Sequence, residues 1–146
     1  MPASPIVSTY DPKLIIMTFG TIIFTGYPDG EFVNITTDGD QFSKIRGIDG
    51  GVDRINMNIF DYTVNVTLKQ TSLTNDQLSA VATADALTGL GVLPLTIKDL
   101  RGATQFLAPQ AWIKKMPDAS FGNDMGTREW VFDTGPAQNF LGGNII

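Results

Sequence analysis

Residues 59–70, IFDYTVNVTLKQ, alternate between apolar and polar side chains along their whole length. Period-two alternation places successive side chains on opposite faces of an extended strand. The apolar face, which we expect to pack on a core, consists of Phe60, Tyr62, Val64, Val66 and Leu68. The opposite face is rich in Thr and Asn and consists of Asp61, Thr63, Asn65, Thr67 and Lys69. One buried and one solvent-exposed face are typical of a strand in an antiparallel sheet.

Other stretches rich in β-branched and aromatic residues predict further strands, separated by turn-forming residues. KLIIMTF (13–19) and TIIFTG (21–26) carry apolar residues on both faces, so we expect both faces to be covered. Tight turns are predicted at YPDG (27–30) and at Arg101-Gly102. The remaining predicted strands are FVNITT (32–37), LPLTIKD (93–99), residues 104–115 with an interruption at Pro109, and TREWVFD (127–133).

A single α-helix is predicted over about residues 74–88. Thr74 suits its N-cap, Gln77 completes a capping box, and Gly89 supplies the end. Residues 1–146 thus form one domain of mainly β structure, an antiparallel β-barrel or sandwich with one flanking helix. The first eight residues are expected to be a flexible N-terminal segment.

Residues 38–58 form a long, mostly polar segment without a regular pattern between two well-patterned strands. Connections longer than about 12–15 residues usually have a function or are disordered. Asp49-Gly50 would allow this segment to fold back as a hairpin arm, with Arg46 and Arg54 flanking the turn. The arm also carries more apolar residues than a pure linker, which suggests packing against another chain: Phe42, Ile45, Ile48, Val52 and Ile55.

Composition excludes several classes of function. The chain carries 15 acidic and 10 basic residues, and this net charge of −5 disfavours a nucleic-acid reader. It contains no Cys and no His, so disulfides, thiol chemistry and the usual general base are absent. DGD at 38–40 lacks the longer calcium-loop pattern, and no nucleophile elbow or phosphate loop occurs. We therefore expect no enzyme, no metal site and no cofactor.

Neither a secretory signal nor a membrane-spanning segment is predicted. The N-terminus lacks a basic start, and the longest aliphatic run, LIIM (14–17), is far shorter than the about 20 residues a membrane helix needs. Trp112 and Trp130 leave a second possibility open. Exposed, they could stack on sugars in a monomeric carbohydrate-binding β-sandwich; Trp130 shares a face with Phe132, which favours core packing instead.

Five motifs occur in order along residues 8–144. They are STYDPK (8–13), QTSLTNDQLS (70–79), AWIKKMPDASFG (111–122), REWVFD (128–133) and FLGGN (140–144). As a set they resemble the inner tail tube proteins of contractile-tailed phages, a family of phage structural proteins. That family is similar in fold to the tube protein of type VI secretion, a β-barrel-like sandwich with one flanking helix.

The resemblance implies a virion structural protein of the phage tail, assembled in the host cytoplasm. Six subunits would form a ring, and rings would stack into a DNA-conducting tube inside a contractile sheath. The implied partners are further copies of the chain, the tail sheath protein, the baseplate and the tail terminator, and DNA would pass without specific binding. A tube protein of a related secretion or contractile injection system is the neighbouring alternative.

The resemblance also implies roles for two sets of residues. The arm, residues 38–58, would reach the neighbouring ring through Ile45, Arg46, Ile48, Asp49, Asp53 and Arg54. Six copies at −5 each give a ring of formal charge about −30, which would repel DNA from the channel wall. The polar face of residues 59–70 is the candidate for the lumen, with solvent or a neighbouring subunit as the other possibilities: Asp61, Thr63, Asn65, Thr67 and Lys69.

Overall fold

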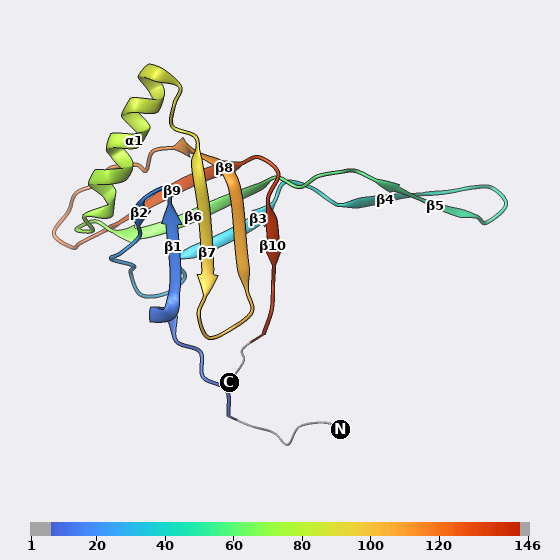
Figure 1. The fold of residues 1–146 in the computed structure, drawn as a ribbon, viewed down its shortest axis with the longest axis horizontal. Helices are drawn as coiled ribbons and strands as arrows, with labels where there is room; N and C mark the ends of the chain where they lie inside the picture. The colour runs from blue at the N-terminus through green and yellow to red at the C-terminus, as the bar shows by residue number, and fades with distance from the viewer. Residues whose placement is uncertain (1–6, 144–146) are drawn as a thin grey trace.

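The computed structural model describes residues 7–143 and has a β-rich body with one α-helix at its side and one long projecting hairpin (Figure 1). This architecture confirms the mainly β class with a single flanking helix. The expected flexible segment, residues 1–8, lies outside the described residues except for its last two positions.

The described strands are all paired antiparallel. The body sheet has the order β2-β1-β7-β8-β9-β6-β3, β10 also pairs with β8, and β4 and β5 form a separate two-stranded sheet. A short 3-10 helix, Pro12–Leu14, precedes β1, and α1 spans Thr74–Thr88. The strands are β1 (Ile15–Phe19), β2 (Ile22–Ile23), β3 (Val33–Thr37), β4 (Phe42–Arg46), β5 (Val52–Asn56), β6 (Tyr62–Lys69), β7 (Leu93–Asp99), β8 (Gln105–Lys115), β9 (Thr127–Thr134) and β10 (Gln138–Phe140).

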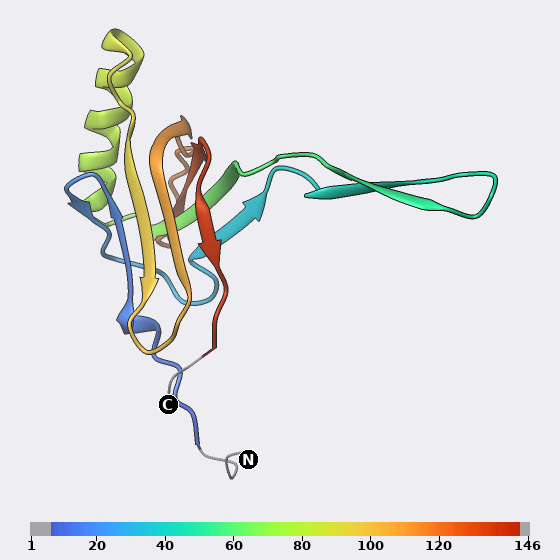
Figure 2. The ribbon, with the colours of Figure 1, turned by 45° about the vertical axis from the view of Figure 1, so that its right-hand side comes forward.

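Strand β8 is the corner at which the body sheet turns from one layer into the other. Its first part, up to Ala111, pairs with β7, whereas residues from Ala111 onward pair with β9. Figures 1 and 2 show β9, β6 and β3 crossing behind β1 and β7 as a second layer. The predicted interruption at Pro109 does not break β8, but it coincides with an irregularity in the pairing with β7. Two steps along β7, from Leu93 to Leu95, oppose three along β8, from Ala111 to Ala108.

The hydrophobic core lies between these two layers. Phe132 of β9 contacts Phe19 of β1, with ring centroids 5.1 Å apart, and Phe24, with centroids 6.0 Å apart. Trp130 is buried, and its indole N–H donates a hydrogen bond of 2.9 Å to Asn75 at the start of α1. The aromatic side chains of β9 therefore join both layers and the helix.

The alternation in β6 is confirmed from Tyr62 onward. Val64, Val66 and Leu68 are completely buried, and Tyr62 packs edge-on against Phe106 with centroids 5.4 Å apart. Phe60 was predicted to share this buried face, and that prediction is wrong: its side chain is 46% exposed. The strand begins at Tyr62, so Phe60 lies before the pairing that would direct it toward the core.

The expectation that β1 and β2 are covered on both faces is also wrong for the single chain. Their inward residues Met17, Phe19 and Ile22 are buried, but Ile16 is 41% and Ile23 62% exposed. Within residues 7–143 the second layer packs against only one face of these strands. The outer face keeps an apolar surface that no described element covers.

Helix α1 has the predicted length but not the predicted N-cap. The residue at the cap position is Leu73, whose side chain makes no cap hydrogen bond. Thr74 is instead the first helical residue, and its hydroxyl accepts the Thr25 N–H at 3.1 Å, so the predicted capping box does not form. Gly89 ends the helix as predicted, in the left-handed conformation with φ of 71°. Thr74 therefore attaches the helix to the chain after β2.

Burial of Tyr27 predicts loss of stability at alkaline pH. Its ring packs on Phe32, its hydroxyl makes no hydrogen bond, and burial raises its pKa to about 12. The folded state thus holds this proton more tightly than an unfolded chain, whose tyrosine pKa is about 10. The resulting stability is fully present below about pH 10 and is lost as the pH rises through about 12. Melting temperatures measured from pH 9 to 12 should fall less steeply in Tyr27→Phe; identical profiles would assign the loss to other groups.

Candidate functional site

The segment 38–58 forms a hairpin arm that extends away from the body in both ribbon views (Figures 1 and 2). The predicted fold-back at Asp49-Gly50 is present, whereas the expectation of an irregular segment is wrong, because β4 and β5 pair regularly within it. Phe42 lies opposite Asn56 at the base of the hairpin. Every residue of β4 and β5 is exposed, so the single chain gives this arm no packing partner among the described residues.

The turn at the tip of the arm is held by its own hydrogen bonds. Gly47 donates its N–H to the Gly51 carbonyl at 2.7 Å, and the Asp49 carboxylate accepts the Gly51 N–H at 3.0 Å. Gly50 has a φ of 87°, a backbone conformation that residues with a Cβ atom rarely adopt. Ile48 lies at this tip completely exposed. The arm thus ends in an ordered turn that presents an apolar side chain.

The register of the hairpin places the three cations of β4 and β5 on one face. Residues directly opposite each other share a face, and Lys44 lies opposite Arg54. Alternation adds Arg46 to the same face, and Arg54 lies over the Phe42 ring at 4.2 Å. Like charges directly opposite each other destabilise a strand pair. We call this surface the cationic face: Lys44, Arg46 and Arg54.

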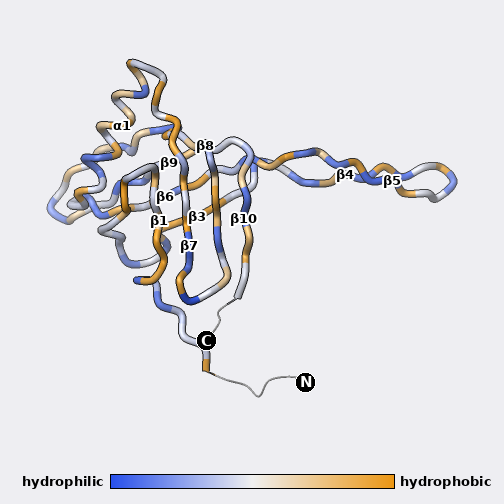
Figure 3. Tube along the Cα trace, in the orientation of Figure 1, coloured by the Kyte–Doolittle hydropathy of each residue, from blue (hydrophilic) through white to orange (hydrophobic). Residues whose placement is uncertain are grey.

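The other face of the arm mixes apolar and polar residues and carries no cation. It carries Ile45 opposite Asp53 and Ser43 opposite Ile55. Figure 3 shows hydrophobic and hydrophilic residues interspersed along the whole projection. The sequence-predicted arm residues are therefore divided by the structure: Arg46 and Arg54 share the cationic face, Ile45 and Asp53 share the other, and Ile48 and Asp49 lie in the turn.

A second candidate surface is the polar side of β3, β6 and β9. The β6 residues predicted to face the lumen, Thr63, Asn65, Thr67 and Lys69, lie together opposite the buried face. Asp61 is exposed and precedes the strand, so it lies at the margin of this surface. Antiparallel pairing adds residues that the sequence reasoning did not assign: Asn34 and Thr36 of β3, and Glu129 and Asp133 of β9. Thr127 of β9, opposite Lys69, completes this surface. We call the following ten residues the polar wall: Asn34, Thr36, Asp61, Thr63, Asn65, Thr67, Lys69, Thr127, Glu129 and Asp133.

The missed residues of β9 had a recognisable signal. In TREWVFD, Glu129 and Asp133 alternate with Trp130 and Phe132, which are buried. What was missing was the pairing that places Glu129 beside Thr67. At one end of the wall, the Thr63 hydroxyl lies 2.7 Å from an Asp38 carboxylate oxygen and 3.4 Å from one of Asp133. The wall is thus a hydroxyl- and amide-rich surface with acidic edges.

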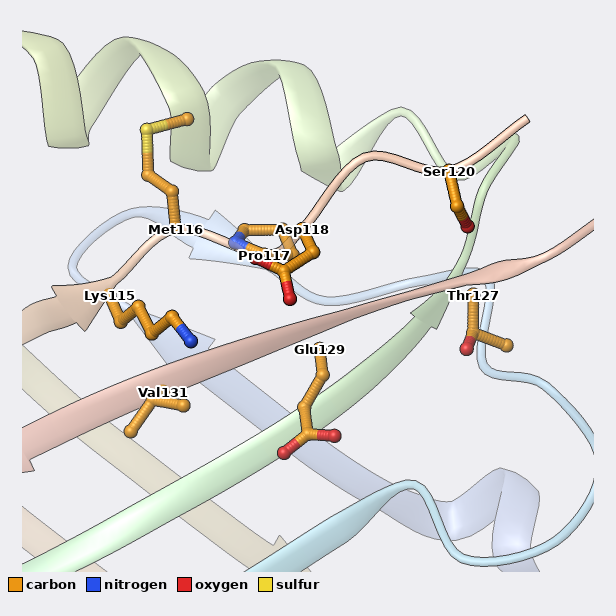
Figure 4. A pocket seen from close by; sticks show the side chains of 8 residues that line it. All are labelled: Lys115, Met116, Pro117, Asp118, Ser120, Thr127, Glu129 and Val131. Carbon is orange, nitrogen blue, oxygen red and sulfur yellow. The ribbon is translucent and has the colours of Figure 1, made fainter.

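Beside the polar wall, the segment after β8 overhangs a hollow of about 310 Å³ (Figure 4). Lys115 and Glu129 line it together with Asp118 and Thr127. The hollow is open and polar, and it holds no nucleophile with an adjacent base. Within residues 7–143 no group of acidic side chains is arranged to hold a metal ion. We therefore assign no catalytic role to the residues that line this hollow.

The two Trp residues differ in exposure. Trp130 belongs to the core, as the alternation of β9 favoured, while Trp112 is half-buried on β8. Burial of Trp130 removes one of the two stacking platforms on which the carbohydrate-binding alternative rested. No helix among the described residues is long and apolar enough to cross a bilayer.

Two sequence comparisons relate the chain to phage structural proteins. The sequence matches the family described as Bacteriophage PhiTE tail tube protein over residues 19–142. "Structural protein ORF10" of Pseudomonas phage KPP10 is 28% identical over 145 residues, covering 94% of this chain and 84% of that protein.

Solved structures share the fold at low sequence identity. The anti-feeding prophage cap, a tube terminating cap, superposes with a TM-score of 0.67 at 9% identity, covering 95% of each chain. The sheath/tube terminator of the PVC extracellular contractile injection system gives 0.64 at 12% identity, covering 94% of this chain and 100% of that one. A chain from the virion of a native gene transfer agent particle gives 0.63 at 8% identity, covering 91% and 100%.

Proposed function

Because the chain belongs to the bacteriophage PhiTE tail tube protein family, we propose that it forms hexameric rings that stack into a DNA-conducting channel inside a contractile sheath. The observation that best supports stacking is the arm, a fully exposed ordered hairpin with a concentrated cationic face. A surface of this kind gains stability by contacting carboxylates on another chain. The whole chain acts as a single tail-tube domain.

Residues 38–58 are the inter-ring arm in this proposal. Ile45, Ile48 and their neighbours supply apolar area, and Arg46 and Arg54 supply charge. Asp49 holds the turn through its hydrogen bond to Gly51, and Asp53 lies across from Ile45 on the face opposite the cationic face. In this contact the tip of the arm supplies apolar packing and the cationic face supplies charge pairing.

Ring closure would cover the two unpaired edges of the body sheet. In the strand order of the body, β2 and β3 stand at the two ends, each with one side unpaired. Exposed strand edges invite uncontrolled pairing unless another chain covers them. A repeated head-to-tail contact between neighbouring subunits covers such edges and closes into a ring.

The polar wall is the proposed lining of the channel. Thr and Asn side chains offer DNA no fixed positive charge, and Glu129 and Asp133 repel phosphate. Lys69 is the single cation among the wall residues of β6. DNA would therefore slide past without specific binding. The tail sheath protein, the baseplate and the tail terminator complete the proposed set of partners in the virion tail, with assembly in the host cytoplasm.

Electron microscopy of the purified chain at increasing concentration, with light scattering for mass, tests the proposed assembly. We expect six-membered rings or tubes with a central channel. A tube protein of a contractile injection system would give the same images. This measurement therefore tests whether the chain forms a tube, and it does not distinguish a phage tail from an injection system. A chain that stays monomeric at every concentration, even when tail tube ends are added as seeds, would contradict the proposal.

A chain without Cys allows the channel lining to be mapped with single cysteines. Glu129→Cys lies on the polar wall and Thr83→Cys on α1, and both positions are exposed in the single chain. We expect a maleimide on a long polyethylene glycol to label both monomers, but to label Glu129→Cys at least about tenfold more slowly in tubes. Equal slowing at the two positions would contradict a luminal polar wall.

A further inference from the structure

A groove of about 350 Å³ opens at the edge between the two layers of the body. Ile15, Val33 and Ile97 provide apolar walls, and all three belong to the core or pack against it. Glu31 and Asp99 add carboxylates from two different parts of the chain. The groove thus combines an apolar floor with an acidic rim.

The groove and the arm lie at opposite ends of β3. The strand begins at Val33 in the groove and ends at Thr37, directly before the arm. Figures 1 and 2 show the arm leaving the body from the far end of this strand. A contact between the arm of one copy and the groove of another is therefore head-to-tail, so it can repeat without limit along a stack.

The combination of acidic charge and aliphatic lining distinguishes this groove from the neighbouring hollows. The groove is lined by two carboxylates and no Lys or Arg. One adjacent hollow contains Lys13 and Lys69 beside Asp29, and the hollow beside the polar wall contains Lys115 beside Asp118 and Glu129. A further hollow, which has Glu31 and Glu129 and no cation, is also lined by the polar side chains of Asn34, Asn65 and Thr67. The cationic face of the arm is attracted by the acidic rim of the groove, where no Lys or Arg opposes it.

Shape and hydrophobicity agree with this choice. Ile48 projects from the tip with its side chain completely exposed, and Arg46 is the cation nearest to it along β4. An apolar side chain in this position is stabilised when it leaves water for an apolar surface. The groove offers that surface within reach of carboxylates, which is the combination that the tip of the arm presents.

We propose that the arm tip of one subunit docks in this groove on a subunit of the next ring. Ile48 lies against the floor formed by Ile15 and Ile97. Arg46 pairs with the acidic rim, chiefly with Glu31, because the Asp99 carboxylate already accepts the Arg101 N–H at 3.0 Å. The partner is thus a second copy of this chain, and the inference rests on the proposed stacking function.

Disulfide trapping in the cysteine-free chain tests the docking. In Ile48→Cys/Glu31→Cys, oxidation under tube-forming conditions should link subunits into a ladder of covalent multimers that reductant reverses. Ile48→Cys/Asp118→Cys, with its second cysteine at the hollow beside the polar wall, is the matched control and should give no ladder. Tubes that form without a ladder, or equal ladders in both variants, would overturn the groove assignment and leave the tube function standing. A chain that gives neither tubes nor ladder would contradict both.

Charge exchange gives an independent readout. Arg46→Glu and Glu31→Arg should each raise the protein concentration needed for tube formation by about tenfold, and less at high salt. The double variant Arg46→Glu/Glu31→Arg restores the pair in reverse, so its threshold should return to within about threefold of the unmodified chain. A double variant no better than the worse single one would overturn the pairing of Arg46 with Glu31.

Discussion

A chain whose residues 43–55 are replaced by Asn-Gly is expected to fold normally and to form no stacked tubes. Phe42 and Asn56 face each other at the base of the hairpin, and Met57 donates its N–H to the Gln41 carbonyl at 2.8 Å. These two contacts remain, and Asn-Gly is a favoured two-residue connection between antiparallel strands. The removed residues bury nothing against the body, so the core keeps its contacts.

Circular dichroism and thermal melting of the shortened chain should match those of the full chain within a few degrees. Electron microscopy should then show monomers or single rings where the full chain gives tubes. Single rings would be the most informative product, because they would separate closure of the ring from stacking. Long tubes from the shortened chain would show that stacking uses another surface, and a melting temperature far below that of the full chain would show that the arm supports the fold.

The strands of the body were largely predictable, because a strand with one buried face alternates apolar and polar residues. Val64, Val66 and Leu68 alternate with polar residues, and the structure buries them as expected. The same pattern in TREWVFD marks Glu129 and Asp133 as a polar face. Only long-range pairing brings that face beside β6, and the register between two distant strands is not contained in either strand alone.

The arm was recognised by its composition, but its strands were not. Both faces of the hairpin meet solvent in the single chain, so no burial imposes an apolar-polar alternation. The register that places Lys44 opposite Arg54 was needed before the charges could be assigned to one face. In the proposed stack the arm residues would follow a pattern set by the neighbouring subunit, which one sequence does not display.

The errors at Thr74 and Phe60 have tertiary causes. The N-cap rule assumes that a Thr hydroxyl has no better partner than the helix itself, but Thr25 supplies one from 49 positions away. Phe60 follows the alternation of the strand and falls just outside its pairing. By contrast, the five motifs along residues 8–144 identified the family correctly, as the match over residues 19–142 confirms.

Phe132→Ala is expected to produce a large loss of stability. Phe132 is completely buried and contacts Phe19 and Phe24 from the opposite layer. Truncating a buried Phe to Ala costs about 3–5 kcal/mol, because apolar burial is lost and a cavity remains. Domains of this kind have a free energy of unfolding of about 5–15 kcal/mol, so the loss is a large fraction of the total.

Val131→Ala provides the matched control, since Val131 is the next residue on the same strand and lies on the opposite, half-buried face. Urea unfolding should show a loss below about 1.5 kcal/mol for Val131→Ala, with the slope unchanged in both variants. Equal losses would contradict a core between the two layers. Stacking should stabilise the unmodified chain and Phe132→Ala alike, because binding to neighbouring subunits favours the folded state by mass action. Each should therefore unfold at a higher temperature in tubes than as a monomer, and the difference between the two chains should persist.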